Sequence, residues 1–234
     1  WRGEARCRTP RRILCAWLAD WTGNRRGADG ERARMTAHGG TLRIIAGELR
    51  GRRVAVPSSG TRPMADRVRE SLFAVLEPRI SGARFADLCA GSGAVGIEAL
   101  SRGAAHALFV ERSRDAAATI RANLEALELA DRATLQCADV LSVLGASDLS
   151  FDLIVADPPY DDDALAAGIM TRCAVSGGPL AAHGLLALTG RTRSNLHPRS
   201  LPKGLRCVRT LVYGDSCVEL LEHVATSASE VGNG

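Results

Sequence analysis

The stretch FADLCAGSGAVG, residues 85–96, decides the fold of this 234-residue chain. Its apolar start, Phe85–Cys89, is typical of a buried strand, and residues 94–102 have the pattern of a helix. The glycines between them allow a tight turn whose backbone N–H groups can approach a ligand closely. A strand, a glycine-rich turn and a helix in this order predict the first unit of a parallel α/β sheet.

Strand and helix patterns continue to alternate after this unit. Residues 205–213 and 216–222 flank Gly214 and Asp215, which predicts an antiparallel hairpin at the end of the sheet. We therefore expect a Rossmann-like α/β fold, with a mostly parallel seven-stranded sheet, helices on both faces and a C-terminal antiparallel hairpin. The other expected strands are 107–110, 133–137, 151–156 and 184–188, and the other expected helices are 113–129 and 162–172.

The segment before the sheet has a different character. Residues 42–56 predict a β-hairpin that turns at Gly51, and residues 65–76 carry a helical apolar stripe. Residues 1–79 hold 17 Arg against 8 acidic residues (+9), whereas residues 80–234 hold 13 basic against 18 acidic residues (−5). This asymmetry predicts a polyanion contact at the basic end, although a solvated arginine face is the alternative.

We expect four parts along the chain. Residues 1–41 are predicted to be a disordered or misassigned extension, with Met35 as the hypothetical true start. Residues 42–79 form a basic RNA-binding appendage, residues 80–224 the catalytic domain and residues 225–234 a flexible tail. The seven cysteines show no C-x-x-C spacing, which argues against a disulfide framework or a zinc site. Cys89, Cys137 and Cys207 are expected to be small core residues in a protein of the reducing cytoplasm.

The glycine-rich turn predicts a cofactor site. Gly91, Gly93 and Gly96 fit the dinucleotide pattern G-x-G-x-x-G, and Glu111 follows at the distance of a ribose-binding acid, so NAD(P) has to be considered. S-adenosylmethionine is favoured because Asp87 can meet the ammonium of a methionine moiety. Asp139 can accept from an adenine amino group, or else cap a helix. The expected cofactor contacts, with no metal, are Asp87, Ala90, Gly91, Ser92, Gly93, Glu111, Arg112, Asp139, Val140 and Asp157.

The second chemical motif is Asp157-Pro158-Pro159-Tyr160, directly after the apolar run 151–156. Neither proline has an N–H to donate, so the strand ends there and holds an acid and an aromatic ring at its carboxyl end. A carboxylate can accept from an exocyclic amine while an aromatic face stacks on a base. The motif therefore predicts methyl transfer to a base amino group; a purely structural strand-ending turn is the alternative.

Together these residues resemble the bacterial 16S ribosomal RNA guanine-N2 methyltransferases of the small-subunit methyltransferase D type. The resemblance runs from Leu42 to Glu222. It is carried by Arg43–Gly47, Gly51–Arg53, Arg62–Pro63, Asp66–Phe73, Asp87–Gly93, Glu98–Ala104 and Asp157–Tyr160.

The resemblance implies a class I methyltransferase that uses S-adenosylmethionine on one guanine of 16S rRNA, as free RNA or in the assembled 30S subunit. Asp157 and the Pro158 carbonyl would accept from the exocyclic amine, and Tyr160 would stack on the flipped base. Phosphate contacts are expected from Arg43, Arg50, Arg52, Arg53, Arg62, Arg67 and Arg69, although Arg67 or Arg69 could pair with Glu70 or an acid of the main sheet instead.

Four other functions compete with this interpretation. A DNA adenine-N6 or cytosine-N4 methyltransferase shares the Asp-Pro-Pro-Tyr motif, but little sequence is left here for a target-recognition region. A protein-glutamine methyltransferase would favour Asn at position 157, and an NAD(P)-dependent reductase has no use for that motif. A non-catalytic RNA-binding module would not need Asp87, Glu111 and Asp157.

Overall fold

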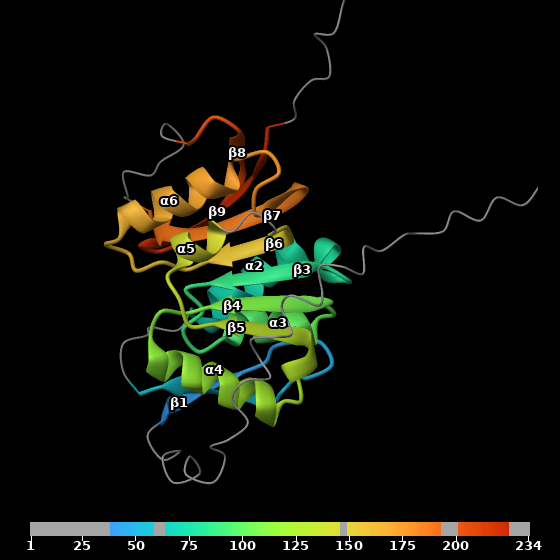
Figure 1. The fold of residues 1–234 in the computed structure, drawn as a ribbon. Helices are drawn as coiled ribbons and strands as arrows, with labels where there is room; N and C mark the ends of the chain where they lie inside the picture. Colours follow the sequence, from blue (N-terminus) through green and yellow to red (C-terminus); the bar gives the residue numbers. More distant parts are fainter. Residues whose placement is uncertain (1–37, 59–63, 146–148, 193–200, 225–234) are drawn as a thin grey trace, which may run out of the picture. The chain divides into compact units, whose positions relative to one another are not determined.

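The computed structural model describes residues 38–58, 64–145, 149–192 and 201–224 (Figure 1). By compactness the chain divides into residues 1–37 and residues 38–234, and every described residue belongs to the second unit. The expectations for residues 1–34 and Met35, for Arg62 and for the tail 225–234 fall outside the described residues. The first described strand begins at His38, four residues before the expected boundary.

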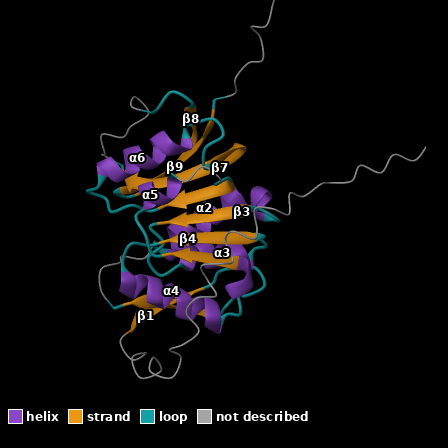
Figure 2. Cartoon of the chain, viewed as in Figure 1, coloured by secondary structure: helices purple, strands orange, loops and turns teal. Residues whose placement is uncertain are grey.

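The main sheet has the seven strands that were predicted, and their order is β5-β4-β3-β6-β7-β9-β8 (Figure 2). Strands β3 to β7 pair in parallel, and β9 pairs antiparallel with both β7 and β8. Their bounds are β3 Arg84–Leu88, β4 His106–Val110, β5 Ala133–Gln136, β6 Phe151–Ala156, β7 Leu180–Arg191, β8 Leu205–Tyr213 and β9 Ser216–His223.

The central parallel strands are buried on both faces, which explains their near-continuous apolar sequences. The helices that cover them begin where side chains satisfy free N–H groups: Ser113, Asp139 and Asp162 each accept from the backbone three residues ahead. The helices are α2 Asp66–Ile80, α3 Ala94–Ser101, α4 Arg114–Ala126, α5 Val140–Leu144 and α6 Asp163–Cys173, with a 3₁₀ turn η3 at Ala130–Arg132.

The strand order reverses direction at β3. From β3 the chain first moves outward through β4 to β5, and then returns to pair β6 on the other side of β3. Right-handed crossovers in opposite directions leave a crevice at such a switch point, outside the carboxyl ends of the strands. The ends of β3 and β6 meet there, because Leu88 is paired with Ala156.

A two-stranded hairpin, β1 (His38–Arg43) and β2 (Arg53–Pro57), stands apart from the main sheet. Its connection, residues 44–52, is longer than the turn expected at Gly51. The reason is a tertiary contact: the N–H groups of Ile45 and Ala46 donate to the buried carboxylate of Glu98 on α3, at 2.8 and 3.0 Å. The connection therefore packs on α3 instead of closing as a tight turn.

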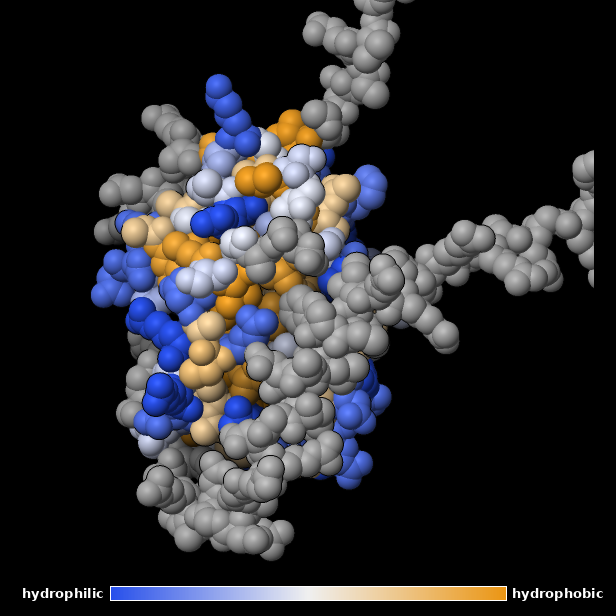
Figure 3. All heavy atoms as spheres, viewed as in Figure 1, coloured by the Kyte–Doolittle hydropathy of each residue, from blue (hydrophilic) through white to orange (hydrophobic). Residues whose placement is uncertain are grey.

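The apolar residues gather between the sheet and its helices, and hydrophilic side chains lie around the outline of the face shown in Figure 3. None of the helices in the described ranges is long and apolar enough to cross a membrane. The expectation for the cysteines was wrong: Cys137 is exposed and Cys89 and Cys207 are half-buried, whereas Cys173 and Cys217 are buried.

Candidate active site at the carboxyl edge of the sheet

The glycine-rich turn joins β3 to α3 in a conformation that few residues tolerate. Gly91 and Gly93 have φ values of +57° and +75°, and Cys89 adopts +61° although it is not a glycine. A Cβ at Gly96 would lie 2.3 Å from the ring of Phe109 on β4, so only glycine lets α3 pack this closely on the sheet. The turn thus presents its backbone and the start of α3 to the crevice.

Glu111 fixes the other side of this turn. Its carboxylate accepts from the N–H of Gly91 at 2.9 Å and from the N–H of Ser113 at 2.8 Å, and the residue is 7% exposed. A carboxylate offers about four lone-pair sites, so these two bonds leave room for ribose hydroxyls. Glu111 therefore joins the end of β4 to the glycine-rich turn and still suits the predicted ribose contact.

Asp87 lies at the base of the crevice and is 3% exposed. Burial raises its pKa well above the ordinary value, and the 2.8 Å hydrogen bond from the Gly96 N–H opposes that rise. The negative charges of Asp157 and Glu111 raise this pKa further, so both carboxylates lie close enough to Asp87 to act on it. Such a group of acids is suited to a ligand that carries positive charge.

Asp157 continues from β6 and donates its N–H to the Leu88 carbonyl of β3 at 3.2 Å. Burial raises the pKa of its carboxyl, while a hydrogen bond from the Thr189 hydroxyl on β7 lowers it. Pro158 is buried, and Tyr160 is 38% exposed. The Tyr160 hydroxyl lies 3.0 Å from the Ser216 hydroxyl of β9, which fixes the ring at the edge of the crevice.

The remaining predicted cofactor residues line the same edge. Ala90 and Ser92 are buried in the glycine-rich turn, and Arg112 is exposed directly after Glu111. Asp139 caps α5, because its Oδ1 accepts from the N–H and the hydroxyl of Ser142; the cap anticipated as an alternative therefore exists. An adenine contact through the other oxygen, and one beside the buried Val140, stay predictions.

The arginines expected to face RNA have different surroundings. Arg43, Arg50, Arg52 and Arg53 are exposed on the hairpin, and Arg67 is exposed in the first turn of α2. Arg52 also donates to the Ala126 carbonyl at 3.2 Å, and Arg53 to the Thr41 hydroxyl at 2.9 Å. These contacts leave charged surface on the hairpin that phosphate can reach.

Arg69 needs a correction. Its side chain is 1% exposed and donates to the Arg43 carbonyl at 2.6 Å and to Asp66 at 3.1 Å. A buried guanidinium cannot meet a phosphate, so we withdraw it from the RNA-facing group. It does pair with an acid, but the acid is Asp66 at the start of the same helix, neither Glu70 nor an acid of the main sheet as the alternative expected.

Four side chains were not assigned a role from sequence. Glu98 and Asn123 hold the hairpin: Asn123 exchanges hydrogen bonds with Ala55 of β2 and donates to the Ser92 carbonyl of the glycine-rich turn at 3.1 Å. Thr189 contacts Asp157, and the guanidinium of Arg191 lies over the Tyr160 ring, 5.8 Å from its centroid. The sequence alone gives little reason to single out these four residues, since polar residues on a helix or at the end of a strand are common.

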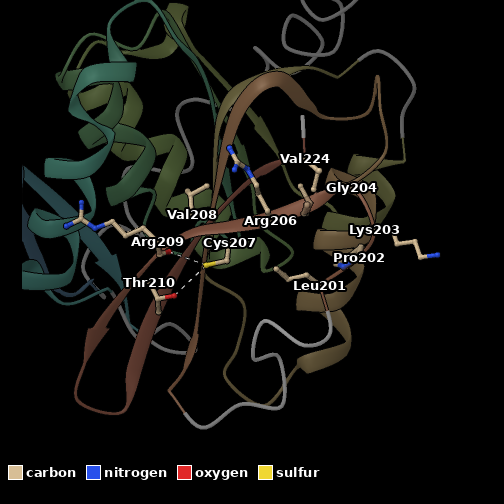
Figure 4. A pocket seen from close by; sticks show the side chains of 11 residues that line it. Leu201, Pro202, Lys203, Gly204, Arg206, Cys207, Val208, Arg209, Thr210 and Val224 are labelled. Atoms are coloured by element: carbon tan, nitrogen blue, oxygen red, sulfur yellow. Dashed lines mark hydrogen bonds between the residues drawn. The ribbon is translucent and has the colours of Figure 1, made fainter. Parts of the chain in front are cut away.

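A separate hollow lies along the outer strand β8 (Figure 4). It is lined by Leu201–Thr210 and Val224, at the start of β8 and just after the end of β9. Because β9 runs antiparallel to β7, this end of β9 lies away from the carboxyl edge that holds Asp157. The hollow is therefore not part of the candidate active site.

Comparison with known proteins identifies the family. The model of a family described as conserved hypothetical protein 95, to which the rRNA small subunit methyltransferases D correspond, matches residues 42–222. The chain belongs to this family. Ribosomal RNA small subunit methyltransferase D of Escherichia coli is 43% identical over 122 residues, which cover 52% of this chain and 61% of that protein. YlbH of Bacillus subtilis, named as an rRNA methyltransferase, is 42% identical over 130 residues, 54% of this chain and 71% of that protein.

Solved structures agree with this assignment. A methyltransferase structure of Escherichia coli, YhhF, is 33% identical with a TM-score of 0.70, and the match covers 80% of this chain and all of that one. A Thermus thermophilus 16S rRNA N2 methyltransferase, solved with AdoMet and guanosine, is 23% identical with a TM-score of 0.63, covering 79% of this chain and 50% of that one, and shares the fold. The chain is an rRNA methyltransferase, and the DNA-methyltransferase alternative is not favoured.

Proposed function

We propose that this rRNA methyltransferase transfers a methyl group from S-adenosylmethionine to the exocyclic N2 amine of a guanine in 16S rRNA, in the cytoplasm. The proposal depends mainly on one observation: Asp157 and Tyr160 follow β6, whose end is paired with the end of β3, next to the glycine-rich turn and its acidic residues. The name of the Escherichia coli relative, a small-subunit enzyme, supports 16S rRNA as the substrate.

The charges in the crevice favour S-adenosylmethionine over a dinucleotide. Glu111 and Asp157 lie close enough to Asp87 for their negative charges to raise its pKa. The pyrophosphate of NAD(P) would be repelled by this group, whereas the sulfonium and ammonium of S-adenosylmethionine would be attracted. Asp87 suits the methionine end of the cofactor and Glu111 suits the ribose. Asp139 and Val140 are assigned to the adenine.

The residues around the acceptor base have separable tasks. S-adenosylmethionine, when bound, supplies a methyl group that is already electrophilic. The protein therefore mainly has to align the amine for an in-line attack. Asp157 and the Pro158 carbonyl accept the two N–H groups of the amine and aim its lone pair, while Tyr160 supports the plane of the base. The proton lost from the methylated nitrogen passes to Asp157 or to solvent.

The hairpin is the proposed RNA arm. It is held to α3 and α4 through Glu98 and Asn123, and Asn123 also contacts the glycine-rich turn, so the arm is tied to the cofactor site. The exposed arginines of the arm, Arg43, Arg50, Arg52 and Arg53, would contact phosphate and make binding depend on salt. The arm thus provides affinity for RNA, and the crevice determines which atom of the base is methylated.

The proposal is tested by transfer of labelled methyl from S-adenosylmethionine to protein-free 16S RNA, to assembled 30S subunits and to duplex DNA, all from cells that lack the enzyme. Label recovered as N2-methylguanosine from the RNA or the subunits is the expected result, and it also tells which form is the substrate. Label on DNA alone, or on another position of the RNA base, would overturn the proposal.

A further inference from the structure

The end of β7 brings a third side chain to the proposed base site. Arg191 is exposed, and its guanidinium carbon lies 5.8 Å from the centroid of the Tyr160 ring. This is the ring on which the proposed function stacks the substrate base. In the free protein Arg191 therefore occupies space beside the place that the base would take.

The surroundings of this pair are built from three strands. β7 extends to Arg191, which pairs with Ser216 of β9, and Ser216 in turn lies 3.0 Å from the Tyr160 hydroxyl. The next residue, Thr192, extends the contact of β7 with the turn between β8 and β9. It donates its N–H to the Asp215 carbonyl at 2.9 Å and its hydroxyl to the Gly214 carbonyl at 3.0 Å. The backbone of Arg191 and the ring of Tyr160 are thus held in place, while the long arginine side chain is exposed and has several rotatable bonds.

The position of Arg191 relative to Asp157 follows from the pleat of β7. Side chains two residues apart on a strand point to the same face, and each residue advances by about 3.3 Å. Thr189 touches Asp157, so Arg191 leaves the strand on the same face roughly 7 Å further out. The long side chain of Arg191 therefore starts further out than Asp157, on the side where the opposite edge of a base would lie if its amine were held at Asp157.

We infer that Arg191 determines the specificity for guanine, by moving off the face of Tyr160 and donating two hydrogen bonds to the O6 and N7 atoms of the base. An arginine fork matches these two acceptors of guanine, whereas adenine presents a donor at position 6. The exposed contact with the Tyr160 ring is weak and is readily exchanged for the base. The inference rests on the proposed function, since it takes the N2 amine to lie at Asp157.

The test combines a change in the protein with the replacement of one acceptor atom of the substrate, the N7 nitrogen of guanine, by a C–H group. Wild type, Arg191→Ala and Arg191→Lys are compared on 16S transcripts made with guanosine or with 7-deazaguanosine, used free or reconstituted into subunits. Arg209→Ala is the matched control, because Arg209 is an exposed arginine on β8, outside the proposed site. The readouts are kcat/KM for methyl transfer and the Kd of S-adenosylmethionine.

On normal transcripts we expect Arg191→Ala to lose about 10- to 100-fold in kcat/KM, with cofactor affinity unchanged. Arg191→Lys should lose nearly as much, because it keeps the charge but not the fork. The 7-deaza transcript should penalise wild type and Arg209→Ala but add little to the loss in Arg191→Ala. An equal 7-deaza penalty in wild type and Arg191→Ala, or no penalty in wild type, would overturn the inference. Absence of N2-methylguanosine with wild type would instead overturn the proposed function.

Discussion

Replacing Thr189 by Val should shift the acid limb of the pH–rate profile to higher pH. The Thr189 hydroxyl donates to the Asp157 carboxylate and lowers a pKa that burial has raised. Thr189 itself is 5% exposed, and valine has nearly the same shape without the hydroxyl. The variant therefore removes the hydrogen bond while it keeps the packing of β7 against β6.

The size of the effect follows from the kind of bond. A hydrogen bond to a charged group contributes about 1.5–3 kcal/mol, which corresponds to about a 10- to 150-fold change in an equilibrium constant. Because the bond stabilises the carboxylate, its loss raises the pKa of Asp157 further and leaves more of it protonated at low pH. The rate on the acid limb should fall by this factor, and much of the loss should be recovered as the pH is raised.

Single-turnover methyl transfer with saturating S-adenosylmethionine, measured over a pH series, gives the position of the limb. Thr189→Ser is the control, since it keeps the hydroxyl and should keep the limb near its wild-type position. Asp87 and Cys89 are the other titrating groups that sense the charge of Asp157, and neither is altered in these variants. A limb that stays in place in Thr189→Val, or that moves equally in Thr189→Ser, would refute the reasoning.

Three further predictions concern the crevice and the hairpin. Asp87→Asn should melt at a higher temperature than wild type at neutral pH, because a carboxyl whose folded pKa is raised costs stability as the pH rises through that pKa. Its Kd for S-adenosylmethionine should rise at the same time. Thermal melts over a pH series should show the stability advantage vanish in acid, and a variant less stable than wild type at neutral pH would contradict the prediction. Gly96→Ala should destabilise the fold by about 1–3 kcal/mol in chemical denaturation, since its Cβ would lie 2.3 Å from the Phe109 ring; an unchanged midpoint would speak against that packing. Reversing Arg52 and Arg53 to Glu should abolish RNA methylation but leave cofactor binding intact, and retained methylation would remove the hairpin from the RNA-binding surface.

Local sequence predicted the central part of the sheet well. Strand β6 has the expected bounds, Phe151–Ala156, because the apolar run is followed, after Asp157, by two prolines. The glycine-rich turn and the acids Asp87, Glu111 and Asp157 meet at one edge because parallel strands bring their carboxyl ends together. These features depend on residues that are close in sequence or on a general rule of topology.

The errors arose where a distant residue decides the local structure. The hairpin connection is long because Glu98, about 50 residues away, accepts from the N–H groups of Ile45 and Ala46 and so holds this part of the chain against α3. Arg69 is buried and donates to the Arg43 carbonyl, a partner 26 residues away in the sequence. Strand β7 was predicted to end at Leu188, where the apolar run stops, but its pairing with β9 carries it on to Arg191. For that reason Thr189 and Arg191 were not recognised as neighbours of Asp157 and Tyr160.

The most direct test of the account is to measure methyl transfer to 16S rRNA and the Kd of S-adenosylmethionine on the same preparation of Asp157→Ala. The account predicts that turnover falls by at least about 100-fold, because the acceptor that aims the amine is lost, while the cofactor Kd rises much less, because Asp87 and Glu111 remain to hold the cofactor. Equal losses of turnover and of cofactor affinity would contradict the assignment of Asp157 to the substrate amine.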